Sequence, residues 1–219
     1  MTQQDKTNRA SWKQNPEAVQ ANILAVATEE FAEHGLAGAR MDEIAARTRT
    51  SKRMIYYYFT DKETLYQRVL ENAYRKVRME EAALELASLS PPDALRRLVE
   101  FTFDHHCANE VFIRLVMIEN IHKAKHLSGS ELIAHVNASA IDSLAQICDR
   151  GRAKGSLRAD ISPLELHWQI SALCFFNVSN RFTFGKNFGP ELFEASGQQR
   201  LRTIIADTIL TFMTATATD

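Results

Sequence analysis

The sequence predicts an all-α protein, and three observations support that prediction. The chain of 219 residues contains only 8 glycines and 5 prolines, whereas a sheet protein needs such residues at its strand connections. Apolar residues recur at helical spacing in nearly every segment. With 45% apolar and 24% charged residues, the chain has the composition of a globular protein with a sizeable core.

The first predicted helix follows a polar stretch over residues 1–15, which we interpret as a loose arm. Pro16 suits the first turn of a helix, and apolar residues recur from Val19 to a break at His34-Gly35. This pattern predicts an amphipathic helix that ends near residue 34.

Two short helices and a longer one follow. Residues 41–45 predict the second helix, and residues 48–50 then break the apolar pattern. Ser51 is a good N-cap for a third helix over 52–58. A fourth helix begins near residue 61 and is expected to run to about residue 88.

The clearest break in the chain is Ser90-Pro91-Pro92. Beyond it, Ser162-Pro163-Leu164-Glu165 combines a cap, an N1 proline and a capping-box acid. The last two helices are apolar over much of their circumference and therefore need two burial partners. We expect them to pair with the same helices of a second copy in a four-helix dimer interface. Helices are predicted over residues 92–107, 109–126, 128–154, 162–184 and 198–215.

Charge is distributed unevenly along a chain whose net charge is only −1. Residues 44–60 contain no acid, while Arg47, Arg49, Lys52 and Arg53 crowd into one short stretch. A concentrated basic spot on a nearly neutral protein usually faces an anionic partner.

The basic stretch coincides with a helix-turn-helix pattern, since two short helices are joined there by about three residues. Ser51 would turn the positive end of the second helix outward, toward phosphate. Ile55 and Phe59, four residues apart, are expected to form the buried side of this helix. That leaves Met54 and the three tyrosines of residues 56–58 to divide between the core edge and DNA.

Three motifs in order, Phe31-Ala32-Glu33-His34-Gly35, Met41-Asp42-Glu43-Ile44-Ala45 and the segment from Ser51 to Leu65, resemble the N-terminal domain of the tetracycline-repressor (TetR) family of regulators. The resemblance implies a three-helix DNA-binding domain with its recognition helix at residues 51–58. It also implies a homodimer on a palindromic double-stranded operator, released by a small-molecule effector, and repression is the expected mode.

The resemblance assigns roles to individual residues. Lys52, Arg53 and Met54 are expected to face bases, Tyr56 the DNA backbone and Tyr57 either. Lys62, at the start of the fourth helix, is expected to hold a phosphate. The expected DNA-binding residues are Arg40, Arg49, Ser51, Lys52, Arg53, Met54, Tyr56, Tyr57 and Lys62.

The chain departs from the family pattern at two places. Ala39-Arg40 stand where members commonly carry Thr or Ser pairs that cap the second helix, so Arg40 is expected to replace that phosphate contact by charge. The usual turn glycine is replaced by Arg49 or Thr50, which predicts an altered turn.

The domains are expected to be an arm at 1–15, a DNA-binding domain at 16–62 and a helical effector-binding and dimerisation domain at 63–219. Aromatic residues of the last domain are numerous enough to line an apolar cavity with a few polar groups, although such residues more often form ordinary core. The candidate ligand-binding residues are Phe103, His106, Phe112, Met117, Asn120, His122, Trp168, Phe175, Phe176, Asn177 and Asn180.

Two alternative functions remain open at this stage. Glu119, His122 and His126 share one helical face and could converge on a metal, although solvated or core histidines are the commoner case. An enzyme is the other alternative, but no G-x-S-x-G, H-E-x-x-H, P-loop or G-x-G motif occurs. We therefore expect no catalytic residue, bound metal or cofactor. A helical adaptor that binds only proteins would not need the basic turn.

Cellular location is predicted from what the sequence lacks. The longest apolar run, over residues 170–178, is too short to span a bilayer, and no secretion signal opens the chain. Cys107, Cys148 and Cys174 have neither metal nor redox spacing. We expect a cytoplasmic protein with reduced cysteines and no membrane partner.

Overall fold

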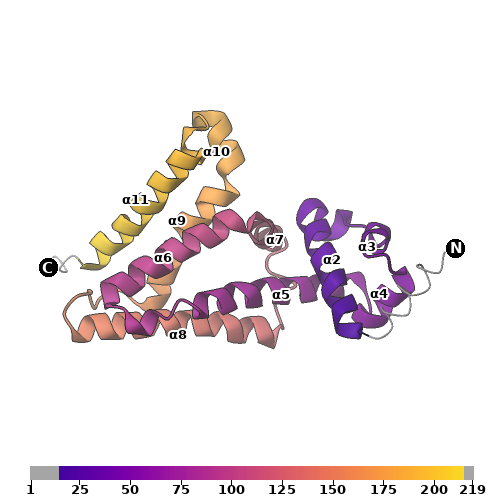
Figure 1. Ribbon diagram of the computed structural model, residues 1–219, viewed down its shortest axis with the longest axis horizontal. Helices are drawn as coiled ribbons and strands as arrows, with labels where there is room; N and C mark the ends of the chain where they lie inside the picture. The colour runs from indigo at the N-terminus through magenta and orange to yellow at the C-terminus, as the bar shows by residue number, and fades with distance from the viewer. Residues whose placement is uncertain (1–14, 215–219) are drawn as a thin grey trace. The chain divides into compact units, whose positions relative to one another are not determined.

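The computed structural model describes residues 15–214, and these form helices without any strand (Figure 1). The predicted arm at 1–15 lies almost entirely outside the described residues. The all-α prediction is confirmed. No helix in the described range has the length and apolarity needed to cross a membrane. Figure 1 draws the helices α2 (Pro16–Gly38), α3 (Met41–Arg47), α4 (Lys52–Phe59), α5 (Lys62–Ala82), α6 (Pro91–Ala108), α7 (Glu110–Ile121), α8 (Glu131–Ala153), α9 (Pro163–Ser179), α10 (Arg181–Phe188) and α11 (Ala195–Thr214), with short 3-10 turns η1 (Leu86–Ser88) and η2 (Glu191–Phe193).

The chain divides into two compact units. Unit 1 contains residues up to Asn72 together with residues 114–130, and unit 2 contains residues 73–113 and the chain from Glu131 onward. Both α5 and α7 begin in one unit and end in the other. The functional boundary expected between residues 62 and 63 stays a prediction.

Unit 1 is built around α2, which begins at its N-cap Asn15 and leaves helical geometry at Gly35. Gly35 has a φ of 67°, a left-handed conformation that glycine adopts without steric cost. The predicted end of the first helix near His34 is therefore confirmed, although one further helical turn reaches Gly38. The Phe31 ring packs edge-on against the Tyr66 ring, with ring centroids 5.0 Å apart.

The core of unit 2 surrounds α6, which lies against α8, α9 and α11 (Figure 1). Ser162 and Glu165 form the predicted capping box at the start of α9. The Ser162 Oγ accepts the Glu165 N–H at 3.2 Å, and Glu165 Oε2 accepts the Ser162 N–H at 2.8 Å. Buried core residues include Leu95, Val99, Leu144, Ile147, Leu166, Ile170, Cys174, Ile205 and Ile209.

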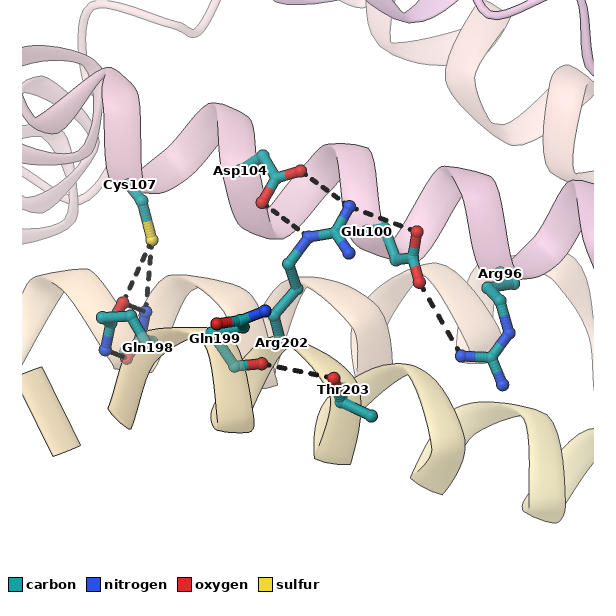
Figure 2. Close-up of polar contacts among 9 residues, drawn as sticks. Arg96, Glu100, Asp104, Cys107, Gln198, Gln199, Arg202 and Thr203 are labelled. Atoms are coloured by element: carbon teal, nitrogen blue, oxygen red, sulfur yellow. Dashed lines mark hydrogen bonds and ion pairs between the residues drawn. The ribbon is translucent and has the colours of Figure 1, made fainter. Parts of the chain in front are cut away.

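A ladder of ion pairs fastens α11 to α6 (Figure 2). Arg202 binds both carboxylate oxygens of Asp104, at 2.8 and 2.9 Å, and also lies 3.2 Å from Glu100. Arg96 continues the ladder from Glu100, at 3.7 Å, to Asp207, at 2.6 Å. A fork of two parallel hydrogen bonds fixes side-chain geometry better than a single contact, so this ladder sets the register of α11.

Three predicted helix bounds are wrong. The single helix expected over 162–184 is divided at Asn180, where φ is −107° and ψ is 2°, into α9 and α10. No glycine or proline marks that break, and the side-chain amide of Asn180 donates to the Ser179 hydroxyl at 2.8 Å. The helix expected to reach residue 126 ends at Ile121. The helix expected to reach residue 88 ends at Ala82, and η1 follows.

Candidate nucleic-acid interface

The helix α4 has one buried and one exposed side, as predicted. Its N-cap Ser51 accepts the N–H of Met54 at 3.2 Å, which satisfies one of the otherwise unpaired amides of the first turn. Ile55 and Phe59 are buried. The exposed residues of α4 are Lys52, Arg53, Met54, Tyr56 and Tyr57. All side chains expected to touch DNA from this helix are therefore accessible in the free protein.

The three consecutive tyrosines have different environments. Tyr57 is the most accessible, with 78% of its surface exposed, and Tyr56 is also exposed. Tyr58 is half-buried and meets the Tyr57 ring edge-on, with ring centroids 5.3 Å apart. Two hydroxyl-bearing rings are thus available at the surface beside the basic side chains.

The turn between α3 and α4 contains Arg49 in a left-handed conformation, with φ of 53°. The N–H of Thr50 bonds to the Ala45 carbonyl at 3.1 Å, and the N–H of Arg49 bonds to the Ala46 carbonyl at 3.2 Å. This pair of bonds is the Schellman motif, whose left-handed position is usually held by glycine. Arg49 therefore occupies the place of the missing glycine, and the turn keeps its geometry at a cost of about 1–2 kcal/mol.

Two basic residues near the turn are already paired with acids. Lys52 Nζ lies 2.6 Å from Asp42 Oδ1, and Arg47 pairs with Glu29 and, at 3.9 Å, with Glu30. A phosphate that binds Lys52 must therefore compete with Asp42.

Three arginines at the same part of the chain have no acidic partner. Arg40, Arg49 and Arg53 are exposed and form no ion pair within residues 15–214. Arg40 starts α3 without a side-chain cap, while its backbone N–H bonds to the buried Glu30 at 3.0 Å. The guanidinium of each arginine is available to an external anion.

Lys62 stands at the first position of α5 and is half-buried. Its Nζ donates to the Ala37 carbonyl at 3.3 Å, so the side chain helps to hold the end of α2. The preceding Asp61 accepts the Thr64 N–H at 2.7 Å, and this backbone hydrogen bond lowers the pKa of the Asp61 carboxyl. Because an ammonium group has three N–H donors, Lys62 can contact phosphate while it keeps the bond to the carbonyl.

The Glu119, His122 and His126 group is divided between the interior and the surface. Glu119 and His126 are buried, and their side chains meet at 2.8 Å between Oε1 and Nδ1. Glu119 Oε2 also accepts the His126 backbone N–H at 3.1 Å. His122 is exposed. This pair ties residues 122–130 to α7, and residues 15–214 contain no group of three or more potential ligands placed to hold a metal.

The expected ligand-binding residues are divided between the units. Met117, Asn120 and His122 belong to unit 1 and are exposed. The others belong to unit 2, where Phe103 is part of the core and Asn177 is buried with its amide bonded to Gln198 at 2.9 Å. The remaining residues in unit 2 are His106, buried; Phe112, Phe175 and Asn180, half-buried; and Trp168 and Phe176, exposed on α9.

The structure adds polar residues around His106 that the sequence did not single out as ligand candidates. His105, also on α6, is buried, and His167 on α9 is half-buried. Burial, together with the smaller effects of the charges of His105 and of Arg78 on α5, lowers the pKa of the His106 imidazole to about 4. Arg78 could not be identified from sequence, because it lies in a run of charged residues that resembles a solvated face.

Comparison with known proteins identifies relatives of both parts of the chain. Residues 23–69 match the family described as "Bacterial regulatory proteins, tetR family", and residues 91–209 match "Tetracyclin repressor-like, C-terminal domain". The chain is 33% identical to the HTH-type transcriptional repressor NicS of Pseudomonas putida, over 90% of this chain and 93% of that protein.

Solved structures share the fold. A transcriptional regulator of Streptomyces coelicolor, SCO4942, aligns with a TM-score of 0.63 at 27% identity, over 87% of this chain and 97% of the other. A tetR-family regulator from Rhodococcus RHA1 aligns with a TM-score of 0.70 at 19% identity, over 89% and 96%.

The turn at Arg49 gives a test that separates backbone strain from charge. Arg49→Gly and Arg49→Ala remove the same cation, so both should weaken duplex DNA binding to the same degree. Only glycine relieves the left-handed conformation, so Arg49→Gly should be more stable than Arg49→Ala by about 1 kcal/mol in urea unfolding. Equal stability of the two variants would contradict the turn geometry described here.

Proposed function

Because the chain belongs to the TetR family of transcriptional regulators, we propose that it is a homodimeric repressor whose α4 helices read two half-sites of a palindromic operator. The observation that carries this proposal is α4 itself, a capped helix that buries Ile55 and Phe59. It exposes five of its other six side chains close in the sequence to arginines that form no ion pair within residues 15–214. A helix of this kind, preceded by a short turn, is the element that enters the major groove in helix-turn-helix proteins.

Family membership confirms the regulatory function predicted from the sequence over the enzyme alternative. The metal-sensing alternative is not favoured either, since Glu119 and His126 bind each other in the interior while His122 is exposed. Repression rather than activation is supported by the description of NicS as a repressor.

Contacts to DNA are proposed from exposure and charge. Arg53 and Met54 face outward from the first turn of α4, where side chains reach base edges, and Lys52 joins them after exchanging Asp42 for DNA. Contacts to the DNA phosphates are proposed for the Tyr56 hydroxyl, Arg40, Arg49 and Lys62. Ser51 places the positive end of the helix dipole toward the duplex.

Dimerisation is proposed through an apolar stripe on α9. Leu164, Trp168, Ala172 and Phe176 follow one another at intervals of four residues, and all four are exposed. Trp168 is 71% exposed and Phe176 51%, which is unusual for large apolar side chains spaced along one helix face. A second copy would cover this α9 stripe across a two-fold axis, together with the exposed Ile204 of α11. Their exposure makes Trp168 and Phe176 better candidates for this interface than for a ligand pocket.

An effector is proposed to act through the helical domain at residues 63–219. Only a ligand that binds the two states of the protein with different affinity can shift the population between them. Both α5 and α7 are continuous from one unit into the other, so a displacement of either helix in unit 2 reaches unit 1 directly. Release from DNA would follow when α4 of the two subunits no longer matches the half-site spacing.

Substitutions of Lys62 and Arg53 separate a contact to the DNA phosphates from a contact to the bases. Lys62→Ala should weaken binding equally to a duplex selected by the parent protein and to an unrelated duplex. The log–log salt slope should fall by roughly one per lost contact, two per dimer. Arg53→Ala should cost about 1–3 kcal/mol per half-site on the selected duplex and less on the unrelated one.

The control for both variants is Arg75→Ala, which removes an exposed cation of α5 outside the interface. Fluorescence anisotropy at several salt concentrations measures all three proteins. If Lys62→Ala and Arg53→Ala both bind the selected duplex like the parent, α4 does not enter the groove.

The α9 stripe is tested by Trp168→Arg, which places a charge at its centre. Sedimentation equilibrium should then show a mass near 24.8 kDa where the parent shows twice that value. The control is Met79→Arg, since Met79 is an equally exposed apolar residue outside the stripe, and this variant should remain dimeric. A Trp168→Arg dimer as tight as the parent would show that another surface forms the interface.

A further inference from the structure

Four buried side-chain nitrogen atoms of unit 2 have no hydrogen-bond partner among the described residues. One is Nε of Arg152 on α8, and the other three are Nε of Arg78 on α5 and the Nδ1 atoms of His105 and His106 on α6. A buried polar atom without a partner costs about 1–3 kcal/mol, and native structures rarely keep such atoms without a use. We call Arg78, His105 and His106 the Arg78 group.

Aromatic rings contact the two imidazoles of the Arg78 group. The Phe112 ring, from α7, lies 6.0 Å from the His105 ring and 6.1 Å from the His106 ring, measured between ring centroids. The Tyr74 ring meets the Phe112 ring edge-on at 5.3 Å, and the Phe101 ring lies 5.7 Å from the His105 ring, again between ring centroids. The two imidazoles of the Arg78 group therefore lie among aromatic rings.

The acidic and basic side chains of α5 near the Arg78 group offset one another. Arg78 pairs with Glu81 through Nη1, which leaves Nε unused. Burial raises the pKa of the Glu81 carboxyl, and Arg78 opposes that rise. Glu80 lies 3.7 Å from His105 Nε2, and the charge of Lys76 opposes its influence on the His105 imidazole.

Burial disfavours the protonated form of the imidazoles in and beside the Arg78 group. Burial lowers the pKa of His105 and of His167 on α9, as it does that of His106, and Arg78 acts on all three in the same direction. Arginine Nε can only donate a hydrogen bond, and an imidazole can donate from Nδ1. A ligand that fits these donors must bring acceptor atoms.

We propose that the Arg78 group holds the carboxylate of a small organic acid whose flat apolar body lies against Phe112 and Tyr74, so that such an acid is the effector. This assignment rests on the proposed function as an effector-controlled repressor. Arg78 Nε and the imidazole N–H groups donate to the two carboxylate oxygens. One imidazole takes up a proton from solvent when the anion binds, so the buried site gains no net charge.

The full-length protein with benzoate and its uncharged analogue benzamide tests the ligand class. Isothermal titration calorimetry should show benzoate binding at least about tenfold tighter than benzamide. Because one proton is taken up with the anion, benzoate affinity should fall by up to about tenfold per pH unit between roughly pH 6 and 8. Equal affinity for the two compounds, or no benzoate binding at millimolar concentration, would overturn the proposal.

His106→Leu tests the site. The variant removes an unpartnered buried nitrogen, so its thermal midpoint should equal or exceed that of the parent. Benzoate affinity should nevertheless drop at least about tenfold and lose its pH dependence. Arg78→Met should also weaken benzoate binding. The control is His135→Leu, which makes the same substitution at an exposed histidine of α8 and should bind benzoate like the parent. Parental benzoate binding by a folded His106→Leu variant would refute the site.

Release of the selected DNA duplex, measured separately, distinguishes this inference from the proposed function. If benzoate binds as expected but leaves the duplex bound, the site stands and control by this ligand fails. If another small molecule releases the duplex equally from the parent and from His106→Leu, control by an effector stands and the Arg78 group is not its site.

Discussion

Burial of Ile55 and Phe59 is the constraint on which the proposed interface depends. A helix of eight residues does not form by itself in water, so α4 exists only because the rest of unit 1 covers these two side chains. Their spacing of four residues then determines which side chains of α4 point outward. The Ser51 cap and the left-handed Arg49 determine where the helix starts. The exposed side chains can be chosen for DNA because the buried pair supplies the stability.

Unit 2 combines a well-packed core with two departures from ordinary packing. The ion pairs from Arg202 to Asp207 hold α11 on α6, and apolar residues of α8, α9 and α11 pack against those of α6. Against this background, the exposed α9 stripe and the unpartnered nitrogen atoms of the Arg78 group each lack a complement within the described chain. A second copy for the stripe and an organic acid for the Arg78 group would supply those complements.

Features set by neighbouring residues could be predicted from the sequence, and features set by distant contacts could not. The Ser51 cap, the capping box at Ser162 and the buried pair of α4 follow from spacing alone, and the structure confirms them. The break at Asn180 was missed because no glycine or proline marks it. The pairing of Glu119 with His126 depends on the end of α7 at Ile121, which the apolar spacing did not mark. Arg78 acts on His106 of α6 and His167 of α9, which come near it only in the fold. The DNA contacts and the ligand residues remain predictions.

Selection of duplexes from a random DNA pool by the purified full-length protein tests the central claim most directly. If two copies of α4 read DNA across a two-fold axis, sequencing of the bound fraction should give a palindrome. Its half-sites should lie about 10 base pairs, or a multiple of that, from centre to centre. A bound fraction without sequence enrichment, or with a single unpaired half-site, would contradict the account.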